Sequence, residues 1–238
     1  MATGGGAIMI APWLTWLSIV SLVVAAVTAV VIALDLRRHP QSMAVMNPVW
    51  PITALYFGPL ALWAYWTMGR QASPAMSGHD HAHHHEREDA KPFWMQTFVG
   101  STHCGAGCTL GDIFAEFLVF FAGITIAGST FGAQLVLDYA FAFLLGVGFQ
   151  YASIVPMRGL KPVAGVIAAF KADALSLTAF EIGLFGWMAL MQFGFFTTPP
   201  KPDTPVFWFM MQIGMIIGFA TAYPMNWVLV KTGIKDAM

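Results

Sequence analysis

The chain contains 238 residues, of which 58% are hydrophobic and only 10% are charged. A water-soluble domain would carry about 25% charged residues, so the composition excludes a soluble globular protein and indicates an integral membrane protein. The formal net charge is −1 at pH 7 and no basic patch is interleaved with aromatic residues, which excludes a typical nucleic-acid-binding surface.

Six apolar segments approach the roughly 20 residues that a helix needs to cross a bilayer. In chain order they span residues 12–34, 48–68, 111–131, 133–155, 174–196 and 206–230. We expect helices, because a backbone in contact with lipid must satisfy its hydrogen bonds internally. The predicted fold is therefore an all-α, polytopic membrane helical bundle with about six transmembrane helices.

These segments divide the chain into three parts. Residues 1–68 hold two N-terminal transmembrane helices, residues 69–92 form a hydrophilic linker, and residues 93–238 form a four-helix membrane domain. With the N-terminus in the cytoplasm, eight of the eleven Lys and Arg residues are cytoplasmic, as the positive-inside rule favours. In this topology both termini are cytoplasmic, and only Arg37, Arg38 and Lys201 face outward.

The linker contains the sequence GHDHAHHHERED, in which five histidines lie beside acidic residues: His79, His81, His83, His84 and His85. Neutral imidazole binds Zn, Cu and Ni, and dense histidine tracts are typical of metal capture. The tract therefore predicts metal capture ahead of the membrane domain. The alternative interpretation is a solvated loop that binds metal weakly and forms no defined site.

The segment STHCGAGCTLGD, residues 101–112, contains both cysteines of the chain and leads into the third apolar segment. Cys104, Cys108, Asp112 and Glu116 are spaced by four residues, so in a continuous helix they share one face, with His103 beside the first. Thiolate and imidazole suit Cu(I) or Zn, whereas carboxylates are harder ligands that also carry protons. Because ionisable residues inside a membrane span mark functional sites, the stripe predicts an ion path.

Two structural interpretations compete with a metal site. Gly105, Gly107 and Gly111 weaken helix formation and could break the stripe. Buried free cysteines also occur simply as small apolar side chains. A disulfide is not expected, because two cysteines four apart in a helix are poorly aimed at each other and the segment is placed in the cytoplasm.

The later apolar segments also carry polar residues. Asp173 and Glu181 are eight residues apart, close to two helical turns, which predicts that both face one partner helix. Alternatively, Asp173 pairs with Lys171 at the surface and Glu181 hydrogen-bonds to a neighbouring helix. Asp138, four residues after Gln134, is either a ligand or proton carrier, or a hydrogen-bonding group between helices.

A proline interrupts the last apolar segment. Pro224 removes one helical hydrogen bond, which membranes tolerate where the backbone is buried in protein or lines a cavity. Tyr223 and Asn226 supply polar groups at this break, so both are candidate metal ligands.

Three separated signatures, THCGAGCTLGD, KADALSLTAFE and TAYPMNWVLVKTGIKDA, occur in this order. In this they resemble a bacterial integral-membrane family known only as a domain of unknown function, with an HCxxGC-type motif and a His-rich leader. The resemblance covers about residues 93–237 and implies a four-helix membrane unit. It implies no reaction, because no biochemical activity is established for that family.

The resemblance also implies a set of functional positions, namely His103, Cys104, Cys108, Asp112, Asp173, Glu181, Tyr223, Pro224 and Asn226. Members of the family commonly carry Glu at the position of Asp112, which keeps the carboxylate. They also carry an Asp-Asn pair shortly after the position of Glu181, where this chain reads GLFGWM. Glu116 lies outside the family pattern and rests on its helical spacing alone.

Together these patterns predict a bacterial inner-membrane protein that handles a transition metal, Cu(I) or Zn, as a secondary transporter or permease-like component. No nucleotide-binding or aspartyl-phosphate motif is visible, so we expect secondary or passive transport. The expected partners are the lipid bilayer, a metal chaperone or other membrane-complex subunits, and further copies of the chain. Two alternatives stay open: an accessory subunit of a larger membrane complex, and a metal-dependent or thiol-redox membrane enzyme.

Overall fold

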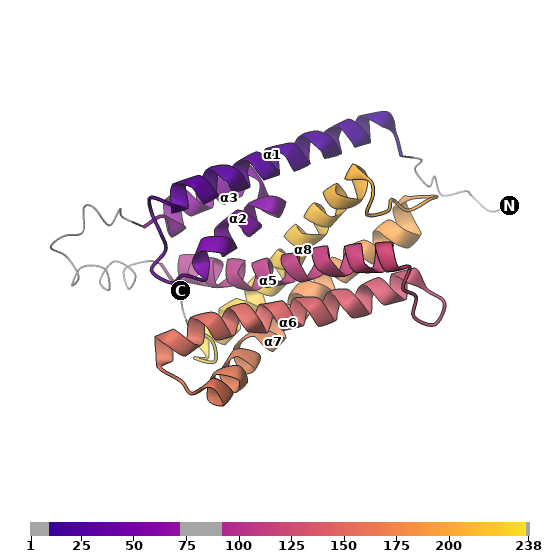
Figure 1. The fold of residues 1–238 in the computed structure, drawn as a ribbon. Coiled ribbons are helices and arrows are strands. Elements are labelled where there is room, and N and C mark those ends of the chain that lie inside the picture. The colour runs from indigo at the N-terminus through magenta and orange to yellow at the C-terminus, as the bar shows by residue number, and fades with distance from the viewer. Residues whose placement is uncertain (1–9, 72–91, 237–238) are drawn as a thin grey trace.

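The computed structural model describes residues 10–71 and 92–236, and this part of the chain is all-α (Figure 1). Its α-helices are α1 (Pro12–Leu36), α2 (Met46–Phe57), α3 (Pro59–Ala64), α5 (Phe93–Ala122), α6 (Thr130–Arg158), α7 (Pro162–Leu190) and α8 (Pro205–Lys231). Two π-helical segments, Tyr65–Gly69 and Met191–Phe195, extend α3 and α7. The five histidines of the predicted linker lie outside the described residues.

Five of the described helices are long and apolar enough to cross a membrane: α1, α5, α6, α7 with its π-helical extension, and α8. The chain is therefore a multi-pass membrane protein whose apolar outer surface contacts the bilayer. The predicted count of about six spans is not confirmed, because residues 48–68 form no such helix. Of the two transmembrane helices expected in residues 1–68, only α1 has the necessary length.

The predicted third span, residues 111–131, is displaced along the chain. The helix α5 begins at Phe93 and ends at Ala122, where Gly123 adopts a φ of 63°. Its first half is rich in Ser, Thr, His, Cys and Gly, which lowers the hydropathy, yet most of these residues are buried. A hydropathy pattern detects contact with lipid, and this half of α5 contacts protein instead.

The predicted second span, residues 48–68, folds as a helical hairpin. Gly58 takes a φ of 54° and a ψ of −132°, which a residue with a Cβ rarely adopts, and the chain reverses there. In a continuous helix Trp50 and Tyr65 would lie about 22 Å apart, but their ring centroids are 5.6 Å apart. The segment therefore enters the bundle and returns to the end from which it came.

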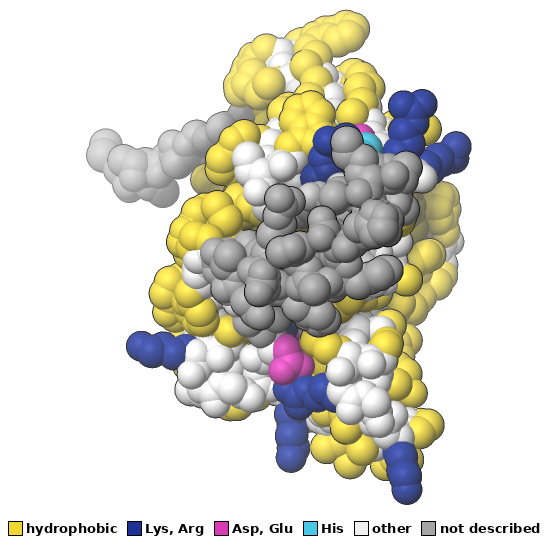
Figure 2. All heavy atoms as spheres, turned by 90° about the vertical axis from the view of Figure 1, so that its left-hand side faces the viewer, with side chains coloured by type: hydrophobic (Ala, Val, Ile, Leu, Met, Phe, Trp, Pro, Cys, Tyr) yellow, Lys and Arg dark blue, Asp and Glu magenta, His cyan; other side chains and the backbone are white. Residues whose placement is uncertain are grey.

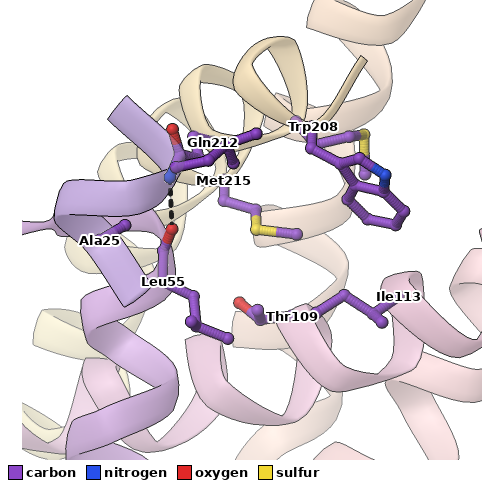
Figure 3. Close-up of a pocket in the computed structure, with 9 residues that line it drawn as sticks. Ala25, Leu55, Thr109, Ile113, Trp208, Gln212 and Met215 are labelled. Atoms are coloured by element: carbon purple, nitrogen blue, oxygen red, sulfur yellow. Dashed lines mark hydrogen bonds between the residues drawn. The ribbon is translucent and has the colours of Figure 1, made fainter. Parts of the chain in front are cut away.

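The tip of this hairpin is held by a hydrogen bond from α8 (Figure 3). The carbonyl of Leu55 has no helical partner four residues later, because Pro59 carries no N–H. The side chain of Gln212 donates to this carbonyl at 2.6 Å and accepts from the Ser21 hydroxyl of α1 at 2.8 Å. Leu55 and Gln212 border an apolar cavity of about 150 Å³ between α1, the hairpin, α5 and α8.

The helices α5 and α6 approach each other closely through glycine residues. A Cβ on Gly107 would lie 2.6 Å from the Cα of Gly146, and a Cβ on Gly111 would lie 2.3 Å from the backbone nitrogen of Ala142. Small residues allow this approach between membrane helices. The glycines therefore do not break the helix, as one interpretation of the sequence expected. Gly107 and Gly111 form its contact with α6, and Gly105 faces Tyr56 of the hairpin.

Several chain segments come together at one end of the bundle. Arg70, which follows the hairpin, pairs with Asp35 in the last turn of α1, with 2.9 Å between Nε and Oδ2. The ring centroid of Phe93 at the start of α5 lies 4.6 Å from that of Trp227 near the end of α8. Figure 2 looks onto this end, where basic side chains form a cluster. The chain segments that meet here contain Arg37, Arg38, Arg70, Arg158, Lys161 and Lys231.

The start of α1 and the end of α8 lie at opposite ends of the bundle (Figure 1). Lys201, in the connection between α7 and α8, lies at the end away from the basic cluster. The predicted topology, which placed Arg37 and Arg38 opposite Arg70, is therefore wrong. The hairpin turns back instead of crossing, so all three arginines share one end.

A polar column as the candidate functional site

The four residues of the predicted stripe lie on one face of an unbroken helix. Cys104, Cys108, Asp112 and Glu116 are all fully buried in α5, and both thiols are free. Four residues of α-helix rise about 6 Å, so the stripe extends over about 18 Å, more than half of the roughly 30 Å hydrocarbon core of a bilayer. The expected placement of these four side chains on one face of a continuous helix is confirmed.

Carboxyl groups from three helices meet in the middle of the bundle. Asp138 of α6 and Glu181 of α7 come close enough to Asp112 for their charges to interact, and the Cys108 thiol lies near Glu181. All three carboxyl groups are buried. Asp112 has no hydrogen-bond partner among the described residues, whereas Asp138 is within hydrogen-bonding range of Glu116, and Glu181 is within that range of the Cys108 thiol. The contact of Glu181 on α7 with the Cys108 thiol on α5 agrees with its interpretation as a hydrogen-bonding group between helices.

The stripe on α5 and the carboxyl groups of Asp138 and Glu181 together form a polar column. This column continues from Glu116 toward the end of the bundle that lacks the basic cluster. The side-chain amide of Gln134 donates to Glu116 Oε2 at 2.7 Å. Gln134 also borders a cavity of about 390 Å³, whose other lining residues include Gln192, Thr198 and Lys201. This cavity lies over the ends of α5 and α7, so Gln134 joins it to the buried carboxyl groups.

Toward the basic end, the column continues through α7. The Ser176 hydroxyl lies 3.5 Å from Cys104 Sγ and 2.9 Å from Asp173 Oδ1, and so links the first thiol to the next carboxylate. The ammonium group of Lys235 donates to the same Asp173 oxygen at 2.8 Å and to Asn226 Oδ1 at 2.8 Å. Asp173 pairs with Lys235 rather than with the exposed Lys171, which the sequence suggested.

His103 lies beside the column, near Asp173 and Lys235. The residue is buried, and its ring packs edge-on against that of Phe149, with 5.9 Å between the ring centroids. It is within electrostatic range of Asp173 and Lys235. The backbone of Phe149 is within hydrogen-bonding range of the His103 ring, whereas the side chain of Gln150 on α6 has no hydrogen-bond partner in the described part of the chain. A buried amide group without a partner is uncommon, because losing water without a replacement costs about 1–3 kcal/mol.

The hairpin contributes one residue that the sequence did not single out. Tyr56 is buried, and a Cβ on Gly105 would lie 2.6 Å from its hydroxyl oxygen. Gly105 lies between Cys104 and Cys108, and both thiols are within electrostatic range of the Tyr56 hydroxyl. The helical period of α5 predicted its own stripe, but no local pattern indicated which hairpin residue would face it.

Tyr223 lies apart from the column, whereas Asn226 belongs to it. The Tyr223 hydroxyl donates to the backbone carbonyl of Trp94 at 3.2 Å, at an exposed position where α8 meets the start of α5. Asn226 is buried one turn further along and contacts Lys235. No sequence pattern singled out Lys235, although Gly233 two residues earlier is a signal for the chain reversal that buries it.

The donors are spread along the column rather than gathered at one point. Within residues 10–71 and 92–236, no group of three or more His, Cys, Asp or Glu side chains is arranged as a ready metal site. Thiols, carboxylates and one imidazole instead follow one another between the cavity beside Gln134 and Lys235. In such an arrangement, only one or two of these side chains could contact a given cation at the same time.

Comparisons with known proteins identify the family but no relative of known activity. Searches of curated proteins and of solved structures found no match. The family match covers residues 93–235, which contain α5 to α8 and every column residue except Tyr56. The chain belongs to the family described as Domain of unknown function (DUF4396).

Proposed function

We propose that the protein is a secondary transporter, or a permease-like component, whose substrate is a transition-metal cation, Cu(I) or Zn²⁺, and that the cation moves along the polar column. The thiols of Cys104 and Cys108 supply soft ligands, and His103 supplies a borderline one. The carboxyl groups of Asp112, Asp138 and Glu181 supply negative charge and can exchange protons for the metal. Such an exchange would couple transport to a proton gradient.

One observation carries this proposal: ionisable groups from three helices are buried together in the middle of the bundle, and among the described residues no positively charged group pairs with Asp112, Asp138 or Glu181. Charged and polar groups inside a membrane span are costly, and those that persist mark ion pathways, proton relays or ligand sites. A bundle that served only as a scaffold would be more stable with apolar residues there. A passing cation would neutralise the negative charge of Asp112, Asp138 and Glu181.

The spacing of the donors also supports passage rather than permanent binding. Conduction requires each site to bind well enough for entry and weakly enough for release, with the next site within reach. Successive α5 donors are about 6 Å apart along the helix axis. A cation released by Cys108 would therefore meet Asp112 or Glu181 after a short step.

The distribution of charge supports an orientation as well. Loops rich in Lys and Arg stay in the cytoplasm. The segments at the basic end of the bundle contain six such residues, against Lys201 in the connection between α7 and α8 at the other end. We therefore place the basic end in the cytoplasm and the cavity beside Gln134 on the opposite face of a bacterial inner membrane. In this orientation, α1 begins outside and α8 ends inside.

Uptake into proteoliposomes tests the proposal. Purified full-length protein is reconstituted, and Zn²⁺ or Cu(I) entry is followed with an indicator trapped inside. We expect Cys104→Ser/Cys108→Ser and Glu181→Gln each to lower the initial rate at least tenfold. Thr109→Ser is the matched control, because Thr109 is buried on α5 but donates to the Gly105 carbonyl of its own helix. Wild-type rates equal to those of empty liposomes, or equal rates in all variants, would refute the proposal.

A further inference from the structure

The last described residues fold back into the bundle. After α8 ends at Lys231, Gly233 takes a φ of 73° and the chain reverses. The amides of Ile234 and Lys235 both donate to the carbonyl of Leu229, at 3.0 and 3.1 Å. This turn directs the Lys235 side chain away from solvent, and the residue is only 2% exposed.

The groups around the Lys235 ammonium have the chemistry of a cation site. Asp173 Oδ1 and Asn226 Oδ1 each accept a hydrogen bond from it at 2.8 Å. Asp173 Oδ2 is buried and has no hydrogen-bond partner among the described residues, and it lies close to Gly146 of α6. Carboxylate and amide oxygens are ligands that metal cations share with ammonium groups.

This site lies at the cytoplasmic end of the column and in line with it. Ser176 connects Asp173 to Cys104, so any cation that passes the two thiols toward the basic end reaches Asp173 next. Lys235 occupies that position with a positive charge of its own. A second cation cannot bind to Asp173 and Asn226 while the ammonium group stays in place. The two positive charges would be only a few ångströms apart and would repel each other.

A surface ion pair holds the same turn in place. Arg158, the last residue of α6, donates from Nε to Asp236 Oδ2 at 2.9 Å, and both side chains are partly exposed. Unlike Lys235, this pair lies where water reaches it. Exposed ion pairs are weak and open readily. Once this pair has opened, the backbone bonds to Leu229 and the contacts of Lys235 with Asp173 and Asn226 hold the turn, and the turn can leave the bundle without the unfolding of a helix.

We propose that Asp173 and Asn226 form the innermost cation site of the column and that Lys235 is a tethered cation that occupies this site when the path is shut. Release of the turn that Asp236 holds would free the site for the transported metal. The opening of the path rests on the proposed function, but the presence of the cation site does not. The chain therefore carries its own competitor for the last binding position.

Equilibrium binding tests the site without transport. Zn²⁺ is the probe, and bound metal is counted on full-length protein in detergent, so the histidines of residues 79–85 contribute equally to every variant. Lys235→Met should bind one more Zn²⁺ than wild type, and adding Asp173→Asn should abolish that gain. Lys231→Met is the matched control, because Lys231 is an exposed lysine of the same segment. No gain in Lys235→Met would overturn the site.

A second measurement keeps the test valid if Lys235→Met folds poorly. Asp236→Asn leaves Lys235, Asp173 and Asn226 unchanged and weakens only the surface pair. A membrane-impermeant maleimide added to the basic side should then label Cys104 several times faster than in wild type. Unchanged labelling would overturn the gating role. Extra Zn²⁺ or faster labelling in a protein that transports no metal would support the site while the proposed function fails.

Discussion

The contact between α5 and α6 allows a sharp prediction, because one substitution can be placed at two positions of the same helix. An alanine Cβ at Gly111 would lie 2.3 Å from the Ala142 nitrogen, whereas ordinary contacts begin near 3.4 Å, so the helices would have to separate by about 1 Å. A Cβ at Gly100, also buried on α5, would meet nothing within 4 Å. Gly100→Ala is therefore a matched control.

The expected cost follows from this comparison. Forcing an extra group into a packed interior costs about 1–3 kcal/mol. Replacing glycine by alanine within a helix gains up to about 1 kcal/mol, but both variants have this gain and it cancels between them. We therefore expect Gly111→Ala to be less stable than Gly100→Ala by about 1–3 kcal/mol.

Unfolding in mixed micelles with increasing SDS, followed by the loss of helical circular dichroism, measures this difference. Gly111 lies between Cys108 and Asp112, and Ala142 lies one turn after Asp138 on α6, so the separation should also widen the gap between the two aspartates. We expect cation uptake to fall in Gly111→Ala and to be unchanged in Gly100→Ala. Equal stability of the two variants would show that α5 and α6 are not in close contact.

Two further predictions concern the hairpin. Gln212→Leu removes the donor for the Leu55 carbonyl, and an unpaired buried carbonyl costs about 1–3 kcal/mol. We expect a loss of that size in the same SDS assay, but a smaller change for Met215→Leu in the same cavity, and equal losses would contradict the reasoning. Hydrogen bonds to Asp35 raise the pKa of Arg70 above its ordinary value, so the pair stays intact as the pH rises and is instead sensitive to salt. We therefore expect hydrogen exchange in the hairpin to be faster in high salt for wild type but independent of salt in Arg70→Met, and a salt effect that survives in the variant would refute this role.

The hairpin shows where sequence reasoning reached its limit. Residues 48–68 are apolar enough to resemble a span, and a hydropathy average cannot register that Gly58 and Pro59 reverse the chain at their centre. A glycine-proline pair is a turn signal, but prolines also occur within membrane helices, as Pro224 does in α8. The contact between Trp50 and Tyr65 shows that the segment is a hairpin and not a span. Because the hairpin turns back, Arg70 lies at the same end of the bundle as Arg37.

The sequence by itself determined the membrane class and the helical stripe of Cys104, Cys108, Asp112 and Glu116. Lipid solvation depends on composition, and a helical face depends only on a period of 3.6 residues, so both are local properties. Only the tertiary structure decided which groups complete the column, because Lys235 meets Asp173 across 62 residues of chain. Contacts of that range follow from how the helices pack, and no local pattern in the chain records them.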